Sequence, residues 1–91
     1  MDKVILTGFI LVPEQELALF KHALVEHQRL TRLEAGCICF RVIENPDNHC
    51  RFDVYEEFTD KAAFNTHQAR VQASDWGKVT ANVERHYQFI E

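Results

Sequence analysis

The sequence lacks the features that nucleotide-binding and nucleic-acid-binding proteins need. It has only three glycines in 91 residues, so it cannot build the usual glycine-rich phosphate-binding loops. Its ten Lys and Arg residues are scattered among fourteen Asp and Glu residues, which gives a net charge of −4. Because binding to a phosphate backbone requires clustered cations, we expect no nucleic-acid partner.

Long apolar runs are also missing. No run approaches the ~20 residues that span a bilayer. The residues before Val4 lack the basic region and the long apolar region of an export signal. We therefore expect no membrane partner and a cytoplasmic location.

Cysteine is scarce and odd in number. Three cysteines without an export signal argue against a disulfide framework, and we expect half-buried thiols on strands at Cys37, Cys39 and Cys50. Paired ligand spacing is absent from these cysteines and from the histidines, so the sequence predicts no metal site; the histidines concerned are His22, His27, His49 and His86. With no nucleotide motif either, we expect no cofactor.

Hydrophobic periodicity predicts the order β-α-β-β-α-β. The predicted strands cover residues 4–12, 37–44, 49–58 and 83–90, and the predicted helices cover 14–32 and 60–72, followed by a short helical stretch to about 82. The first helix has an apolar stripe at steps of three and four residues: Leu17, Phe20, Leu24, His27 and Thr31. This order predicts one α+β domain over residues 1–91 with a ferredoxin-like arrangement.

Turn residues at 45–48 predict a hairpin between the second and third strands. A four-residue loop there would place Glu44 opposite His49 and Cys39 opposite Val54.

Three further local features follow from the residue types. We expect Ile38 to share a strand face with Phe40 and Val42, Gly36 to end the first helix in a left-handed conformation, and Thr59 to cap the second helix.

The strands are apolar on both faces, which indicates a homodimer. In the first strand, Ile5 and Phe9 face opposite to Leu6 and Ile10. One face can pack on the two helices, whereas the other would expose a large apolar patch. A second copy of the chain is the simplest cover for that face, since twofold symmetry is the commonest form of oligomer.

The stretch from 34 to 67 resembles the antibiotic biosynthesis monooxygenase family. The resemblance rests on Glu34-Ala35-Gly36-Cys37 at the end of the first helix and then on Arg51-Phe52-Asp53-Val54-Tyr55-Glu56-Glu57-Phe58, Asp60, Ala63-Phe64 and His67. The subgroup of quinol monooxygenases and autoinducer-2 degrading enzymes looks nearest. The resemblance implies a dimeric α/β barrel with a cavity between the sheet and the helices of each protomer.

The same resemblance implies a range of activities. Members of the family include cofactor-independent oxygenases for polycyclic phenols and quinols, haem-degrading enzymes and isomerases of phosphorylated sugars. Haem-degrading members carry an Asn on the first strand and a Trp on the second helix, where this chain has Thr7 or Gly8 and His67. The stretch Ala73–Trp76 keeps an aromatic residue but lacks the Pro-His that many members have there.

His67 and Glu56 are the candidate catalytic residues. His67 lies on the apolar stripe of the second helix, and a histidine in that place acts either as a general acid or base or as a core residue. Glu56 and Glu57 point to opposite faces of one strand, and a buried carboxylate needs a partner. We expect Glu56 to pair with His67 or Arg41, in a catalytic pair, a structural salt bridge or a dimer contact.

Aromatic residues near the predicted cavity favour an aromatic substrate. The candidates for substrate binding, each of which could instead be a packing residue, are Trp76, Tyr55, Phe40, Phe52, Phe64 and Arg41. The sequence thus predicts a cofactor-independent monooxygenase acting on a small aromatic or quinol-type molecule. An isomerase or degradative enzyme for a small polar metabolite, or a binding module without turnover, are the alternatives.

Overall fold

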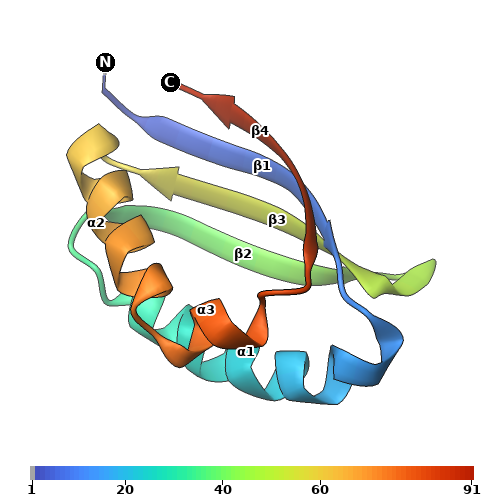
Figure 1. Ribbon diagram of the computed structural model, residues 1–91. Coiled ribbons are helices and arrows are strands. Elements are labelled where there is room, and N and C mark those ends of the chain that lie inside the picture. Colours follow the sequence, from blue (N-terminus) through green and yellow to red (C-terminus); the bar gives the residue numbers. More distant parts are fainter. Residues whose placement is uncertain (1) are drawn as a thin grey trace.

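The computed structural model describes residues 2–91 and has the predicted α+β, ferredoxin-like arrangement (Figure 1). Its elements are β1 (Val4–Leu11), the 3₁₀ turn η1 (Glu14–Glu16), α1 (Leu17–Arg32), β2 (Cys37–Asn45), β3 (Asn48–Phe58), α2 (Lys61–Gln72), α3 (Asp75–Val79) and β4 (Glu84–Ile90). The strands form one antiparallel sheet in the order β2-β3-β1-β4. Within residues 2–91, no helix combines the length and apolar character needed to cross a membrane.

The helix α1 confirms the predicted stripe. Its buried residues are the five that the periodicity selects: Leu17, Phe20, Leu24, His27 and Thr31. Glu26 and Arg29 lie on the exposed side and form an ion pair one turn apart, at 2.7 Å. All three helices lie on one face of the sheet (Figure 1), so this stripe packs against the strands.

The core lies between the helices and alternate residues of the strands. It combines side chains from β1, β3 and the helices, and its most buried members are Val4, Phe20, Phe52 and Phe58. The 3₁₀ turn η1 follows Pro13, and the helix proper begins at Leu17 rather than at residue 14. Proline has no N–H to donate, so it suits the residue just before a helical turn.

The predicted hairpin register is wrong. Asn45 pairs with Asn48 across a two-residue turn, and the next pair is Glu44 with Phe52, so a bulge leaves residues 49–51 of β3 without partners in β2. As a consequence Cys39 lies opposite Glu57 instead of Val54. A loop-length argument assumes a regular ladder, and the extra residues in one strand break that assumption.

The predictions for Ile38, Thr59 and Gly36 are also wrong. A second irregularity between Cys37 and Cys39 turns Ile38 out to solvent, whereas Cys37 packs against the core. Asp60, not Thr59, caps α2: its carboxylate accepts a hydrogen bond from the N–H of Ala63 at 2.7 Å.

Gly36 does not adopt a left-handed conformation, since Gly8 is the one glycine with positive φ. A Cβ atom on Gly36 would lie 2.3 Å from the Cβ of Ala63, so close packing against α2 explains the glycine. Gly8, at φ 150°, has a similar constraint, because a Cβ atom there would lie 2.0 Å from the carbonyl oxygen of His86 in β4.

Candidate active site

A cavity of about 240 Å³ lies between the sheet and the helices. It is lined by residues from β1, β3, β4 and all three helices: Leu6, Ile10, His27, Glu56, His67, Gln68, Val71, Trp76, Thr80, Val83, Arg85 and Tyr87. The wall combines apolar side chains with a nearly equal share of polar ones, several of them titratable, which can orient a small molecule.

A hydrogen bond to an acidic side chain fixes the orientation of the His67 ring. It lies on α2 and is 2% exposed. Its Nδ1 atom lies 3.0 Å from the Oε2 atom of Glu34, in the loop that follows α1. Arg70 donates to the same oxygen at 2.6 Å and to the Thr31 hydroxyl at 2.9 Å. A carboxylate only accepts hydrogen bonds, so Nδ1 carries the proton and Nε2 keeps a free lone pair.

His67 Nε2 lies near Glu56 but beyond hydrogen-bond distance from it. The distance from His67 Nε2 to Glu56 Oε1 is 3.7 Å. Glu56 is 8% exposed and lies between Leu6 and Phe40 in the neighbouring strands. Burial in these apolar surroundings, followed by the negative charge of Glu34, raises the pKa of Glu56 to about 7.

The surroundings shift the pKa values of the two groups in opposite directions. Burial lowers the pKa of His67, and the hydrogen bond that its Nδ1 atom donates to Glu34 partly offsets that effect. In water a histidine binds its proton more tightly than a glutamate, and here that order is reversed, because the pKa of His67 is lowered and that of Glu56 is raised to about 7. Near neutral pH, His67 is therefore a neutral base beside a glutamate that can hold a proton, an arrangement suited to general acid–base catalysis.

His27 and Trp76 form one wall of the cavity. Their rings stack in parallel, with centroids 4.2 Å apart. His27 is 5% exposed, and its Nδ1 atom has no hydrogen-bond partner among residues 2–91. Burial, followed by the charges of His67 and Arg70, lowers the pKa of His27 to about 3, so the ring is neutral at neutral pH.

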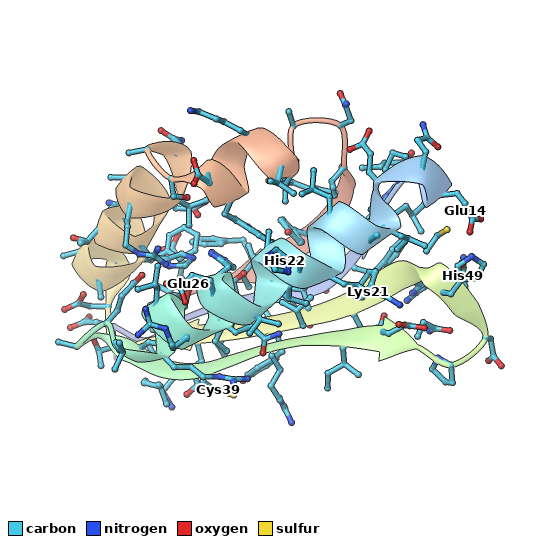
Figure 2. The ribbon with its side chains drawn as sticks, turned by 90° about the horizontal axis from the view of Figure 1, so that it is seen from below. Glu14, Lys21, His22, Glu26, Cys39 and His49 are labelled. Carbon is cyan, nitrogen blue, oxygen red and sulfur yellow. The ribbon has the colours of Figure 1, made fainter. Side chains whose placement is uncertain are left out.

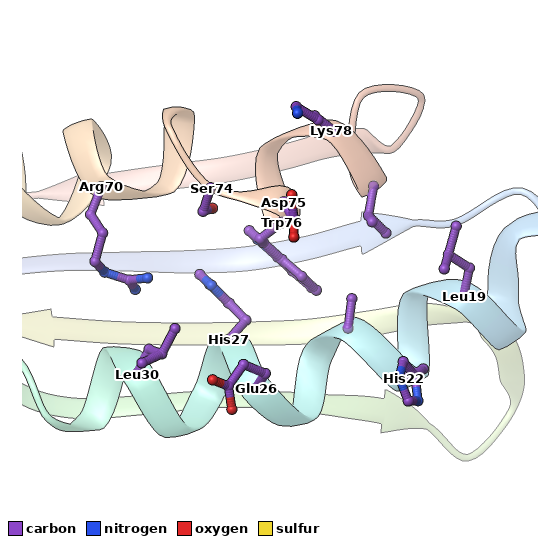
Figure 3. Close-up of a pocket in the computed structure, with 12 residues that line it drawn as sticks. Leu19, His22, Glu26, His27, Leu30, Arg70, Ser74, Asp75, Trp76 and Lys78 are labelled. Carbon is purple, nitrogen blue, oxygen red and sulfur yellow. The ribbon is translucent and has the colours of Figure 1, made fainter.

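The same stacked pair also lines a larger groove on the outside of the helices. This groove, of about 660 Å³, runs between α1 and the α2–α3 segment and includes Leu30, Arg70 and Ser74 (Figure 3). His27 and Trp76 thus stand between the outer groove and the inner cavity.

The β4 side of the cavity supplies a phenol and a guanidinium. Tyr87 is 40% exposed, yet desolvation and then the charge of Glu56 raise its pKa to about 12, so its hydroxyl remains a proton donor. Arg85 is anchored by hydrogen bonds from Nη2 to the carbonyl and hydroxyl oxygens of Thr80, at 3.1 and 3.0 Å.

The candidate residues from the sequence fall into three groups. His67, Glu56 and Trp76 line the cavity, and the Phe40 ring lies behind it, 6.1 Å from that of His67. Phe52 and Phe64 lie on the same side of the sheet but pack in the core. Tyr55 and Arg41 lie on the opposite face, where the Arg41 guanidinium is 5.3 Å from the Tyr55 ring, so neither reaches the cavity or Glu56.

Sequence reasoning missed Glu34 and His27 as site residues. His27 did fall on the buried stripe of α1, and that pattern was the available signal. Glu34 lies in a loop 33 residues from its partner His67, and no local pattern connects them.

Comparison with known proteins identifies the family to which this architecture belongs. The fold and the cavity define an α+β domain of ferredoxin-like order with a site between sheet and helices. The family model for antibiotic biosynthesis monooxygenases matches residues 4–79. The chain therefore belongs to the antibiotic biosynthesis monooxygenase family. No curated protein matches the sequence.

Solved structures share this fold along nearly the whole chain. A protein of unknown function from Bacteroides thetaiotaomicron, described as a possible oxidoreductase, has a TM-score of 0.83 at 20% identity, covering 99% of this chain and 97% of its own. A candidate antibiotic biosynthesis monooxygenase from Deinococcus radiodurans has a TM-score of 0.80 at 25% identity, and the match covers 97% of this chain and 90% of that protein. A variant of SnoaB, a cofactor-independent oxygenase from Streptomyces nogalater, has a TM-score of 0.80 at 13% identity, and the match covers 100% of this chain and 93% of that protein.

Proposed function

We propose that this protein is a cofactor-independent monooxygenase that acts on a small aromatic or quinol-type substrate. The observation that carries the proposal is the position of His67 Nε2 inside the cavity, 3.7 Å from a glutamate whose pKa is raised to about 7. Family membership supports the same class of reaction. The subgroup of quinol monooxygenases is the part of the family that this proposal favours.

In the proposed reaction, His67 removes the proton of a phenolic substrate, and Glu34 keeps its ring in the required tautomer. The electron-rich anion then reduces O₂ itself. One oxygen atom enters the product as a carbonyl in place of two hydrogens, and the other leaves as water. The protein supplies orientation, a dry cavity and control of proton affinity.

The cavity sets a size limit on the substrate. Its volume of about 240 Å³ lies below the ~300–1,000 Å³ typical of sites for drug-sized ligands. We therefore infer a substrate of one or two fused rings. Tyr87 and Gln68 are the polar groups in the lining that suit a phenol or carbonyl oxygen.

We also propose that a second copy of the chain covers the open sheet face. That face carries Ile43, which is 57% exposed, and Ile90, which is 44% exposed and lies opposite Ile5 of β1. Twofold packing of this face against itself would remove these side chains from water.

Oxygen consumption tests the proposed function. The purified protein is given a panel of naphthohydroquinones and single-ring quinols, autoxidation is subtracted, and His67→Ala is assayed beside the wild type. We expect saturable consumption that His67→Ala reduces by roughly 10²–10⁴-fold. Consumption that survives the substitution would remove His67 from its role. If no member of the panel is consumed, the oxygenase proposal fails, and an isomerase or a binding module becomes the better account.

A further inference from the structure

Glu14, His49 and Cys50 place three different metal-binding groups together at the end of the molecule where the β2–β3 hairpin turns. Glu14 Oε2 lies 2.7 Å from His49 Nε2, and Glu14 Oε1 lies 3.9 Å from Cys50 Sγ. One ligand atom from each residue lies within 4.8 Å of the other two. Figure 2 shows Glu14 and His49 side by side there.

The fold, rather than sequence spacing, brings these residues together. Glu14 begins η1, and His49 and Cys50 are 35 and 36 residues further along the chain. In a regular strand, His49 and Cys50 would point to opposite faces. They lie in the bulge where residues 49–51 have no partner in β2, and a bulge re-aims side chains, so both reach Glu14.

The backbone under the cluster is well fixed. The carbonyl of Cys50 accepts a hydrogen bond from the N–H of Val12 at 2.8 Å, which ties β3 to the residue two before Glu14. The Asn48 side chain accepts a hydrogen bond from the N–H of Cys50 at 3.0 Å. A metal ion would therefore need side-chain adjustments and no rearrangement of strands.

We propose that Glu14, His49 and Cys50 bind a divalent metal ion, with Zn²⁺ as the best match. Thiolate, imidazole and carboxylate are the three side-chain ligands that zinc uses. Tetrahedral zinc holds its ligand atoms roughly 3.3–3.7 Å apart, given metal–ligand distances of ~2.0–2.3 Å. The ligand atoms here need to move by about 1 Å or less to reach that spacing, and a water molecule completes the fourth position. Magnesium and calcium are disfavoured by the sulfur ligand.

The site is separate from the proposed catalytic cavity, because none of its three residues lines that cavity. Its test therefore does not depend on turnover. Cobalt(II) is the probe, since it replaces zinc at such sites and a thiolate ligand gives it a near-ultraviolet charge-transfer absorption. The reduced full-length protein is titrated with Co²⁺, and Zn²⁺ is then added in competition.

We expect a thiolate–cobalt band that Zn²⁺ abolishes. Cys50→Ser should remove the band, and Cys39→Ser, the matched control at another half-buried thiol, should keep it. Glu14→Gln and His49→Ala should each weaken binding by at least ~100-fold, since even an outer-shell partner is worth ~10–100-fold. His22→Ala, an exposed histidine on α1, should leave binding unchanged.

Alkylation gives a second measurement on the same proteins. Zn²⁺ should protect Cys50 from iodoacetamide and leave Cys39 reactive, as read by mass spectrometry of the two peptides. Circular dichroism confirms that each variant is folded. The proposal is overturned if no thiolate band forms, if the band persists in Cys50→Ser, or if it follows Cys39 instead.

Discussion

Glu56 and Glu57 are neighbours in the chain, yet they lie on opposite faces of β3 and have opposite properties. Glu56 faces the helices, and burial raises its pKa to about 7. Glu57 faces away from them and pairs with the Tyr55 hydroxyl at 2.7 Å and with Lys3 at 2.9 Å. The hydrogen bond from Tyr55, followed by that from Lys3, lowers the pKa of Glu57.

The difference between the two faces explains where the chemistry can occur. On the open face, polar groups have close partners: Arg51 pairs with Asp53 at 3.0 Å, and its guanidinium lies 3.8 Å from the centre of the Phe9 ring. On the helix-covered face, Glu56 and His67 are desolvated, and Glu56 has no charged partner closer than the 3.7 Å to His67 among residues 2–91. Glu56 therefore changes protonation near neutral pH, whereas Glu57 is already ionised there.

The largest expected effect is on turnover. Glu56→Gln keeps the shape of the side chain but removes the group that exchanges a proton with His67, so kcat should fall by roughly 10²–10⁴-fold in the oxygen-consumption assay. Glu57→Gln is the matched control on the next residue, and its kcat should equal that of the wild type. Equal losses in both variants would contradict the distinction between the faces.

The next effect is on stability, measured by urea unfolding between pH 4.5 and 8. Glu56 binds its proton more tightly in the folded than in the unfolded protein. Its contribution to the free energy of unfolding is therefore complete below pH 4.5 and is lost as the pH rises to about 7. At ~1.4 kcal/mol per pKa unit, the wild type should lose roughly 3 kcal/mol relative to Glu56→Gln across that range.

Glu57 should show the reverse sign when the same measurement is extended below pH 4.5. Its pKa is lowered in the folded state, so the wild type should gain stability relative to Glu57→Gln as the pH rises towards 4.5 and keep that gain at higher pH. Parallel pH profiles for the two variants would show that the faces do not differ in the way described.

The third effect concerns assembly through the open face. Ile43→Asp should weaken the proposed dimer by roughly 30-fold or more, because the loss of a buried anchor costs about 2 kcal/mol. Val25→Asp is the control, on the exposed side of α1, where Val25 is 72% exposed. Analytical ultracentrifugation measures both. A dimer disrupted by Val25→Asp and not by Ile43→Asp would place the interface on the helices.

The smallest effect comes from His27→Phe. Phenylalanine keeps a ring stacked on Trp76 and removes a buried nitrogen without a partner, so stability at pH 7 should rise by about 1 kcal/mol or more. The pKa of His27 is lowered to about 3, so the wild type loses stability as the pH falls from 6.5. The advantage of the variant should therefore grow in acid. His22→Phe, at an exposed histidine of the same helix, is the matched control for the added ring.

Much of the fold could be predicted from the sequence, because periodicity reports which side of an element is buried. The stripe of α1 was confirmed residue by residue, and the opposite faces of Glu56 and Glu57 follow from the two-residue repeat of a strand. The requirement of a buried carboxylate for a partner also led to the pairing of Glu56 with His67.

The remaining features depend on contacts that the local sequence does not encode. The bulge at residues 49–51 depends on how two strands meet, and it changes the partner of Cys39 as well as the direction of His49 and Cys50. Glu34 comes from a loop and meets His67 only after α1 and α2 have packed. Tyr55 and Glu56 lie next to each other in the family motif, and only one of them faces the cavity.

Carboxyl-carbon NMR tests the central claim most directly. The protein is labelled at its glutamate side chains, Glu56 and Glu57 are assigned from the Gln variants, and both are titrated from pH 3 to 9. The account predicts a midpoint at about 7 for Glu56 and one below 4.5 for Glu57. A midpoint for Glu56 near 4.5, like that of an ordinary surface glutamate, would contradict it.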